Sequence, residues 1–282
     1  MAAVGRGRGR GRGLLARDLP QEAQTRPGDS ASGDSKATEN GVEVKKEEPG
    51  MSRQDSILEL QHVLDSLTLD VSDQELNNLY QLAESASSND SDIKRVTEQV
   101  YSKFTSDREY AKTGAFICEK LAALEVNGTK FRSLLLSMIQ ADYKDKDNLR
   151  SKSVSKFLNI LSFMCQIFGT LRTAGGEVFK PLVSPLYECF NMILDSDHSD
   201  NDEFECLNEQ LQSIGRDLEQ SDRDKMEQMM VKIRSKVIRN GSSQQARCTL
   251  LEIIESYCRG WKDLSNDVTR FYCDTMMDIL TD

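Results

Sequence analysis

The stretch from Asn148 to Leu194 constrains the fold of this chain most, because its apolar residues recur at the spacing of an α-helix. Steps of three and four residues place one set of apolar side chains on a single helical face: Val154, Leu158, Leu161, Cys165, Phe168 and Leu171. Further apolar residues widen this face until the second half of the helix is apolar on most sides. We expect such a helix to be buried between neighbours.

A short loop and a second helix complete this stretch. Ala174-Gly175-Gly176 interrupts the first helix, and Pro181 starts the second. Proline is tolerated in a first helical turn, where its missing N–H would be unpaired anyway. Because this pair of helices cannot cover its own apolar surface, we expect a helical pair on each side of it.

The flanking sequence predicts such pairs. Apolar stripes at helical spacing run through residues 56–69, 73–86, 92–104, 106–124, 129–143, 204–218, 222–237, 250–257 and from about 266 onwards. Ser72 and Glu75 form a capping-box pattern, and Asp92 is the expected N-cap of a later helix. Glycine-containing positions are the expected helix ends: Asn127-Gly128, Asn240-Gly241 and Gly260. About ten helices in units of roughly 35 to 50 residues predict an all-α fold, an α-solenoid of antiparallel helical pairs.

Composition supports an all-α body. Of the five prolines only Pro181 and Pro185 lie beyond residue 50, and nine of the 17 glycines lie within residues 1–50. Turns between many short strands would require more of both residues. We therefore divide the chain into a tail, residues 1–50, a short amphipathic helix or linker, residues 51–71, and a helical-repeat domain, residues 72–282. The short helix is expected to dock on the body; the alternative is a free helix for a partner's groove.

The tail is predicted to be disordered, because a Gly-Arg repeat is followed by an acidic, polar stretch that cannot offset the entropy of ordering. Four arginines alternate with glycine: Arg6, Arg8, Arg10 and Arg12. Arginine binds phosphates and stacks on bases, so one hypothesis is an RNA-contacting arm. The alternative is a solubilising tail.

The body is acidic. The net charge of the chain is −10, and residues 1–50 hold nine basic and eight acidic side chains, which leaves −11 for the body. This balance argues against non-specific duplex binding as the main role. The seven cysteines form no CxxC pair, so we interpret them as reduced core residues of an intracellular protein, located in the cytoplasm with the nucleus as a second site. No apolar run is long enough to span a bilayer, and no membrane association is expected.

The sequence contains no pattern of a catalytic or cofactor site. Walker, HExxH, GxSxG and glycine-rich dinucleotide motifs are missing. The two histidines, His62 and His198, have no visible partner for a Cys–His nucleophile pair. We therefore predict that the chain is not an enzyme and uses no cofactor or metal.

The most acidic window follows Leu194 and contains no Lys or Arg: Asp195, Asp197, Asp200, Asp202, Glu203, Glu205 and Glu209. It lacks the spacing of a calcium-binding loop. We interpret it as a solvated loop whose end supplies acids to a helix N-terminus. A kinase or basic-partner site at Ser196 or Ser199 is the alternative.

One segment resembles a known family. FRSLLLSMIQADYKDKDNLRSKSVSKFLNILSFMCQIFGTLRTAGGEVFKPLVSPLYECF is similar to the middle-domain family of the translation-initiation scaffold factor four-G. The positions that carry the resemblance are Phe131, Arg132, Leu135, Leu136, Phe168, Leu171, Leu182, Tyr187 and Cys189. The segment LLEIIESYCRGWKD looks like the family's last repeat. The resemblance covers most of residues 72–282.

The resemblance implies about five antiparallel, HEAT-like helical repeats. It also implies a non-enzymatic adaptor in translation regulation, which links an RNA-binding protein at the mRNA 3′ end to translation initiation factors, with RNA helicases among the family's partners. Among small stand-alone members, the chain looks most like those that interact with the histone stem-loop-binding protein. The Gly-Arg tail is similar to members that interact with the poly(A)-binding protein. The alternatives are a direct RNA-binding regulator of mRNA translation and a poly(A)-binding-protein-associated translation factor.

Partner-binding residues are expected among exposed aromatic and arginine side chains, which dominate interface energies. The candidates near the last repeat are Trp261, Phe271 and Tyr272. For Trp261 the alternative is that it plugs the final helix pair. A candidate basic edge for an acidic peptide or RNA, or else a solvated helix face, is formed by Arg132, Arg150, Lys152 and Lys156. An uncapped last repeat would also support a homodimer.

Overall fold

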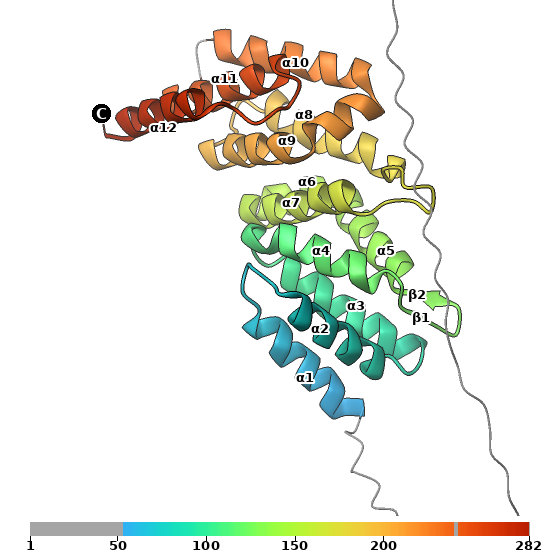
Figure 1. Ribbon diagram of the computed structural model, residues 1–282. Helices are drawn as coiled ribbons and strands as arrows, with labels where there is room; N and C mark the ends of the chain where they lie inside the picture. The colour runs from blue at the N-terminus through green and yellow to red at the C-terminus, as the bar shows by residue number, and fades with distance from the viewer. Residues whose placement is uncertain (1–52, 240–241, 282) are drawn as a thin grey trace, which may run out of the picture. The chain divides into compact units, whose positions relative to one another are not determined.

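The computed structural model of the protein describes residues 53–239 and 242–281 (Figure 1). The tail, residues 1–50, with its four predicted RNA-contacting arginines, lies outside the described residues, and so does the expected helix end at Asn240-Gly241. The described part of the chain forms twelve α-helices, two 3₁₀ turns and one two-stranded hairpin.

The elements follow one another along the chain without large gaps. The first half contains α1 (Arg53–Ser66), α2 (Asp73–Ala86), α3 (Asp90–Phe104), α4 (Ala111–Leu121), β1 (Glu125–Val126), β2 (Thr129–Lys130), α5 (Phe131–Lys144), α6 (Lys146–Lys152) and α7 (Val154–Thr170). The second half contains α8 (Val183–Asp195), α9 (Asn201–Ser221), α10 (Arg223–Ile238), α11 (Gln244–Cys258) and α12 (Asn266–Thr281).

The helices are arranged in two layers (Figure 1). In one layer α2, α4, α7, α9 and α11 contact one another in that order; in the other α1 contacts α3, α3 contacts α5, and α8 contacts α10. Pairs that connect the layers are α1 with α2, α3 with α4, α5 with α7, α8 with α9, and α10 with α11, and α12 packs on α11. The predicted all-α solenoid of about five helical repeats is therefore confirmed.

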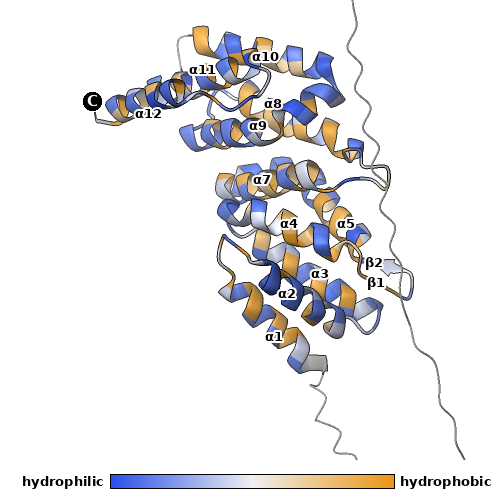
Figure 2. Cartoon of the chain, in the orientation of Figure 1, coloured by the Kyte–Doolittle hydropathy of each residue, from blue (hydrophilic) through white to orange (hydrophobic). Residues whose placement is uncertain are grey.

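Helix α7 is the most deeply buried element of the stack. It lies between α4 and α9, and it buries ten of its residues: Phe157, Leu158, Ile160, Leu161, Ser162, Phe163, Met164, Cys165, Ile167 and Phe168. Other helices carry hydrophobic and hydrophilic residues together (Figure 2). The prediction that helical pairs cover the stretch from Asn148 to Leu194 on both sides is confirmed.

Hydrogen-bonding side chains mark the repeat length. Four pairs between equivalent positions of α7, α9 and α11 are each separated by 44 residues: Ser162 with Cys206, Gln166 with Gln210, Asn208 with Glu252, and Gln212 with Ser256. The amide–amide contact from Gln166 Nε2 to Gln210 Oε1 measures 2.8 Å. Since a buried polar group is costly without a partner, these pairs fix the register between successive repeats.

The short N-terminal helix docks on the body. Ile57, Leu60, Leu64 and Leu67 are buried, and α1 packs against α2 and α3. The capping box of α2 forms as expected: Glu75 N–H donates to Ser72 Oγ, and Ser72 N–H donates to Glu75 Oε2 at 2.8 Å. The Ser72 hydroxyl, which donates to Glu75 Oε2 at 2.6 Å, lowers the pKa of Glu75 most, and the Ser72 N–H lowers it further.

The predicted long helix after Asn148 is divided in two. Lys152 ends α6, and Ser153 begins α7 as its N-cap, with Ser153 Oγ accepting from Lys156 N–H at 3.2 Å. A serine hydroxyl that satisfies the first free N–H groups favours a new helix over continuation of the old one. Similarly, Asn89 rather than Asp92 is the N-cap of α3, and Asp92 N–H donates to the Asn89 side chain.

Asn127-Gly128 is not a helix end. Both residues have positive φ, 51° and 87°, and they form the turn of the β1–β2 hairpin, while α4 ends at Leu121. Asn-Gly suits a two-residue hairpin turn that requires positive φ at both positions. This hairpin also delays the start of the next helix from the expected Thr129 to Phe131.

Some residues of the predicted apolar stripes are exposed. Phe116 of α4 and Leu251 of α11 face solvent rather than the core.

Five cysteines are buried and free, whereas Cys258 and Cys273 are free and exposed. The interpretation of the cysteines as core residues is therefore wrong for these two. Gly260 has positive φ and follows α11, as expected for a helix end.

Close packing at one glycine gives a stability prediction. A Cβ atom at Gly114 of α4 would lie 2.3 Å from Phe104 Cγ. We expect Gly114→Ala to lower the free energy of unfolding by about 1–3 kcal/mol, because overpacking outweighs the better helix propensity of alanine. Urea denaturation followed by circular dichroism measures the change. In a Phe104→Leu background the same substitution should cost less; an equal cost in both backgrounds would contradict the packing argument.

Candidate partner-binding surfaces

The last helix exposes apolar side chains. In α12 none of the described residues is buried, and Phe271, Met277 and Leu280 are 61%, 65% and 62% exposed. Exposed apolar surface on a folded domain is typical of contacts with other proteins. Two of the three predicted aromatic candidates, Phe271 and Tyr272, lie on this helix.

Trp261 packs inward. Its indole N–H donates to Glu219 Oε2 at 2.8 Å, and its ring lies against Gly215, where a Cβ atom would approach it to 2.7 Å. The ring of Tyr257 meets it edge-on, with 5.9 Å between the ring centroids. Trp261 is therefore placed where it closes the last helical pair onto α9.

Tyr272 and Phe271 are neighbours in different environments. Tyr272 is half-buried, and its hydroxyl donates to Glu255 Oε2 of α11 at 3.1 Å. Burial, together with this carboxylate, raises the pKa of Tyr272 well above its ordinary value. The Phe271 ring meets it edge-on at 5.3 Å and is otherwise exposed. Tyr272 thus fixes α12 on α11, while Phe271 is free to contact a partner.

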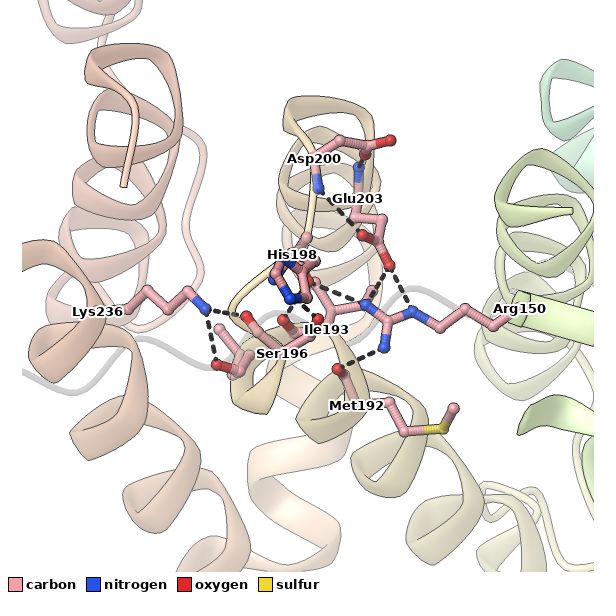
Figure 3. A network of polar contacts seen from close by, with 10 residues as sticks. Arg150, Met192, Ile193, Ser196, His198, Asp200, Glu203 and Lys236 are labelled. Atoms are coloured by element: carbon pink, nitrogen blue, oxygen red, sulfur yellow. Dashed lines mark hydrogen bonds and ion pairs between the residues drawn. The ribbon is translucent and has the colours of Figure 1, made fainter. Parts of the chain in front are cut away.

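Arg150 is the centre of an internal network, which we call the Arg150 clasp (Figure 3). Its Nε and Nη2 atoms each lie 2.7 Å from Glu203 Oε1, and Glu203 is only 1% exposed. Nη1 donates to the carbonyl of Met192 at 2.9 Å, and Nη2 to Ser199 Oγ at 3.0 Å. The clasp therefore binds α6 to the C-terminus of α8 and the first turn of α9.

The acidic window begins with the loop between α8 and α9, which is held from both sides. Ser199 Oγ donates to the carbonyl of Ile193 at 2.6 Å. From α10, Lys236 donates to the carbonyls of Leu194 and Ser196 (Figure 3), and Lys232 pairs with Asp195 at 2.6 Å. As predicted, the window also supplies acids to a helix N-terminus, because Asp200 and Glu203 form the capping box of α9. A kinase site at Ser196 or Ser199 stays a prediction.

The four residues of the predicted basic edge differ in their surroundings: the two arginines are engaged within the fold, and the two lysines are exposed. Arg132 Nη1 donates to the carbonyl of Arg172 at 2.8 Å, and its guanidinium lies over the Phe179 ring at 5.6 Å, so it pins the loop after α7. Arg150 is engaged in the clasp. Lys152 and Lys156 are exposed and form no ion pair within the described residues, so they are the accessible part of this edge.

A groove of about 630 Å³ lies beside the acidic loop. Its lining includes the buried residues Leu194, Phe204 and Ala246, one wall comes from α10, and the opposite wall carries acidic residues of the loop. Sequence reasoning missed this groove, because its walls come from segments far apart in the chain. The available signal was the run of basic residues along α10.

Five of the seven cysteines are buried and free. Burial raises the pKa of Cys206 to about 11 and that of Cys189 to about 12, so both thiols stay protonated. His62 and His198 are exposed. Across residues 53–239 and 242–281, His, Cys, Asp and Glu side chains form no group of three or more that could hold a metal ion. Nor does that part of the chain contain a helix with the length and apolarity to cross a membrane.

Stacked helical pairs in two layers define a helical-repeat protein of the α-solenoid class. Comparison with known families makes this more specific, since the MIF4G domain matches residues 61–256, from within α1 to near the end of α11. The chain belongs to the MIF4G domain family.

Individual relatives extend this result. The CBP80/20-dependent translation initiation factor of Xenopus tropicalis is 31% identical over 238 residues, which cover 84% of this chain and 41% of that protein. The chain thus spans less than half the length of that factor. The human MIF4G domain-containing protein is 30% identical over 176 residues, covering 61% of this chain and 79% of the relative. MIF4G domain-containing protein B of Danio rerio is 29% identical over 192 residues, or 66% and 86% of the two chains.

We expect two ion pairs, one in the Arg150 clasp and one at Lys232, to contribute unequally to the free energy of unfolding. Arg150→Ala leaves the buried Glu203 carboxylate without its cation, and we expect it to lower the free energy of unfolding by about 3–5 kcal/mol. Lys232→Ala removes a more exposed ion pair with Asp195 and should cost about 1 kcal/mol or less. Chemical denaturation of both variants measures the difference. Similar losses for the two would contradict the structural role of Arg150.

Proposed function

We propose that this chain is a non-enzymatic adaptor in mRNA translation. It would link an RNA-binding protein at the mRNA 3′ end, such as the histone stem-loop-binding protein, to translation initiation factors. The observation that carries this proposal is membership of the MIF4G domain family, together with similarity over 84% of the chain to a protein named as a translation initiation factor. An RNA helicase is a further candidate partner.

The proposed mechanism is tethering. A stack held in register by buried pairs can present separate patches, so that one bound partner raises the effective concentration of the other near its target. Two patches of the described chain support this mechanism. One is the exposed side of α12 with Phe271; the other is the edge with Lys152 and Lys156. Trp261 and Tyr272 would act indirectly, by fixing α12.

The alternatives differ in the partner that recruits the mRNA. A direct RNA-binding regulator would use Arg6, Arg8, Arg10 and Arg12, which lie outside the described residues, with Lys152 and Lys156. A poly(A)-binding-protein-associated factor would dock that protein in place of a stem-loop-binding one. The acidic balance of the body, −11, favours contacts through proteins.

A tethered reporter tests the adaptor proposal. The full chain, fused to an RNA-binding module, is recruited to the 3′ untranslated region of a reporter mRNA. We expect translation of the reporter to rise several-fold, and Phe271→Asp to remove most of the gain because an aromatic anchor is lost. Leu58→Asp, at a position of similar exposure on α1, is the matched control and should keep the gain.

The tail distinguishes the two main alternatives in the same assay. If the variant with Arg6, Arg8, Arg10 and Arg12 changed to Ala loses RNA binding but still activates the tethered reporter, the adaptor proposal is supported. If the reporter gain disappears with those four arginines, the direct RNA-binding regulator replaces it. No gain from the unmodified chain would refute the adaptor proposal itself.

We also propose that the chain forms a homodimer through α12. Met277 and Leu280 of α12 are exposed, and exposed apolar surface on a folded domain is typical of contacts with other proteins. Pairing with a second copy would cover this surface in a closed, two-fold contact. Light scattering should give a dimeric mass at micromolar concentration and a monomeric mass for Met277→Asp/Leu280→Asp. A monomeric parent chain, or equal disruption by Leu58→Asp, would contradict this proposal.

A further inference from the structure

Helix α12 has two exposed flanks, one on each side of the face that packs on α11. The packed face consists of half-buried residues at steps of three and four: Val268, Tyr272, Met276 and Ile279. Since successive residues of a helix are about 100° apart, Met277 and Leu280 lie on one flank of this face and Phe271 lies on the other. The flank with Phe271 is therefore separate from the apolar pair proposed for the homodimer.

The flank with Phe271 is acidic. Asp267 lies one turn before Phe271, while Asp274 and Asp278 lie one and two turns after it. The ring and the three exposed carboxylates thus form one row, which we call the Phe271 stripe. Arg270, the only basic residue of α12, pairs with Asp274 at 3.4 Å, and both of these side chains are largely exposed, at 82% and 70%. Asp267 and Asp278 form no ion pair with any described residue.

An aromatic ring lies in the middle of this acidic row. Phe271 is 61% exposed, and its edge-on contact with Tyr272 leaves most of the ring in water. Carboxylates alone would form an ordinary solvated face, which does not require an aromatic side chain. Because an exposed ring gains by leaving water, and aromatic anchors contribute strongly to protein interfaces, the stripe combines an anchor with a charge pattern that a partner has to match.

We propose that the Phe271 stripe binds a segment of a partner protein in which lysine or arginine side chains flank an apolar one. The apolar side chain would cover the Phe271 ring, and the basic groups would pair with Asp267 and Asp278. These two positions are about 16 Å apart along the helix axis, at 1.5 Å per residue. A basic group next to the ring would also be attracted by its face.

The same charges argue against two other occupants. Three carboxylates repel nucleic acid, which carries a phosphate at every nucleotide. They also repel the identical stripe of a second copy of this chain, since like charges in contact across an interface are unfavourable. A second copy is therefore expected on the flank with Met277 and Leu280, and the Phe271 stripe stays available to a basic partner segment.

This inference rests on the proposed adaptor function and specifies the chemistry of one partner. Its test uses binding alone, so its failure is distinguishable from a failure of the reporter assay. The full chain is used to select from a displayed library of random twelve-residue peptides, with counter-selection on the Phe271→Ala variant to remove peptides that bind elsewhere. Two enriched sequences are then synthesised with a fluorescent label, and their dissociation constants are measured by anisotropy.

We expect the peptides that require Phe271 to combine basic residues with a large apolar one, and their affinity to fall as salt rises. The double variant Asp267→Lys/Asp278→Lys should weaken their binding about tenfold or more, because it replaces attraction by repulsion. Unchanged thermal unfolding of this variant confirms that it is folded.

The matched control is Asp65→Lys/Asp224→Lys, which changes the net charge by the same amount. Both of its aspartates are exposed and form no ion pair with the described residues. Asp224 is the second residue of α10, as Asp267 is of α12, and Asp65 lies in the last turn of α1, as Asp278 does in α12. This control should bind the peptides like the parent chain.

Three results would overturn the proposal. One is a selection in which the peptides that require Phe271 are acidic or uncharged, or in which no such peptides are found. Another is an equal loss of affinity in the two double variants, which would reduce the effect to net charge. The third is a labelled single-stranded RNA that depends on Phe271 while the peptides do not, which would assign the stripe to nucleic acid.

Discussion

Burial of α7 between α4 and α9 is the interaction on which the rest of the stack depends. Each large apolar side chain that is fully buried contributes roughly 1.5–3 kcal/mol, and nine of the ten buried residues of α7 are apolar. Because this helix lacks a broad polar side, removal of either α4 or α9 would expose apolar side chains of α7 to water. The central pair therefore requires pairs before and after it, and the chain folds as a series rather than as separate hairpins.

Polar contacts then determine how these pairs are aligned. The side-chain pairs 44 residues apart connect α7 to α9 and α9 to α11 at matching heights. The Arg150 clasp adds a charged contact that is satisfied in only one arrangement, since Glu203 is buried and already part of a capping box. Buried ion pairs of this kind contribute little net stability, but their loss is costly. Apolar side chains of α12 and of the outer side of α10 stay exposed, as do Lys152 and Lys156.

Helical periodicity and capping residues predicted most of the fold, because both are local. Ser72 with Glu75 and the stripe of α7 are examples. Asn127-Gly128 was misleading because the same dipeptide suits a helix end and a hairpin turn, and only the pairing of Glu125 with Lys130 decides between them. The clasp could not be predicted, since Arg150 and Glu203 lie 53 residues apart without a local pattern. For the aromatic candidates the sequence could not show that Trp261 and Tyr272 bond to carboxylates while Phe271 is exposed.

The loop between α8 and α9 has a consequence for how the protein comes apart. Repeat arrays usually lose structure piecewise from their ends, since each unit contacts only its neighbours. Here Arg150 of α6 donates to Ser199 and Lys236 of α10 donates to the carbonyl of Ser196, so both helices hold the loop between α8 and α9. Fraying of α10 would release one side of this loop, which Arg150 holds on the other side together with the buried Glu203. The carboxyl-terminal half should therefore resist partial opening and melt in a single cooperative step.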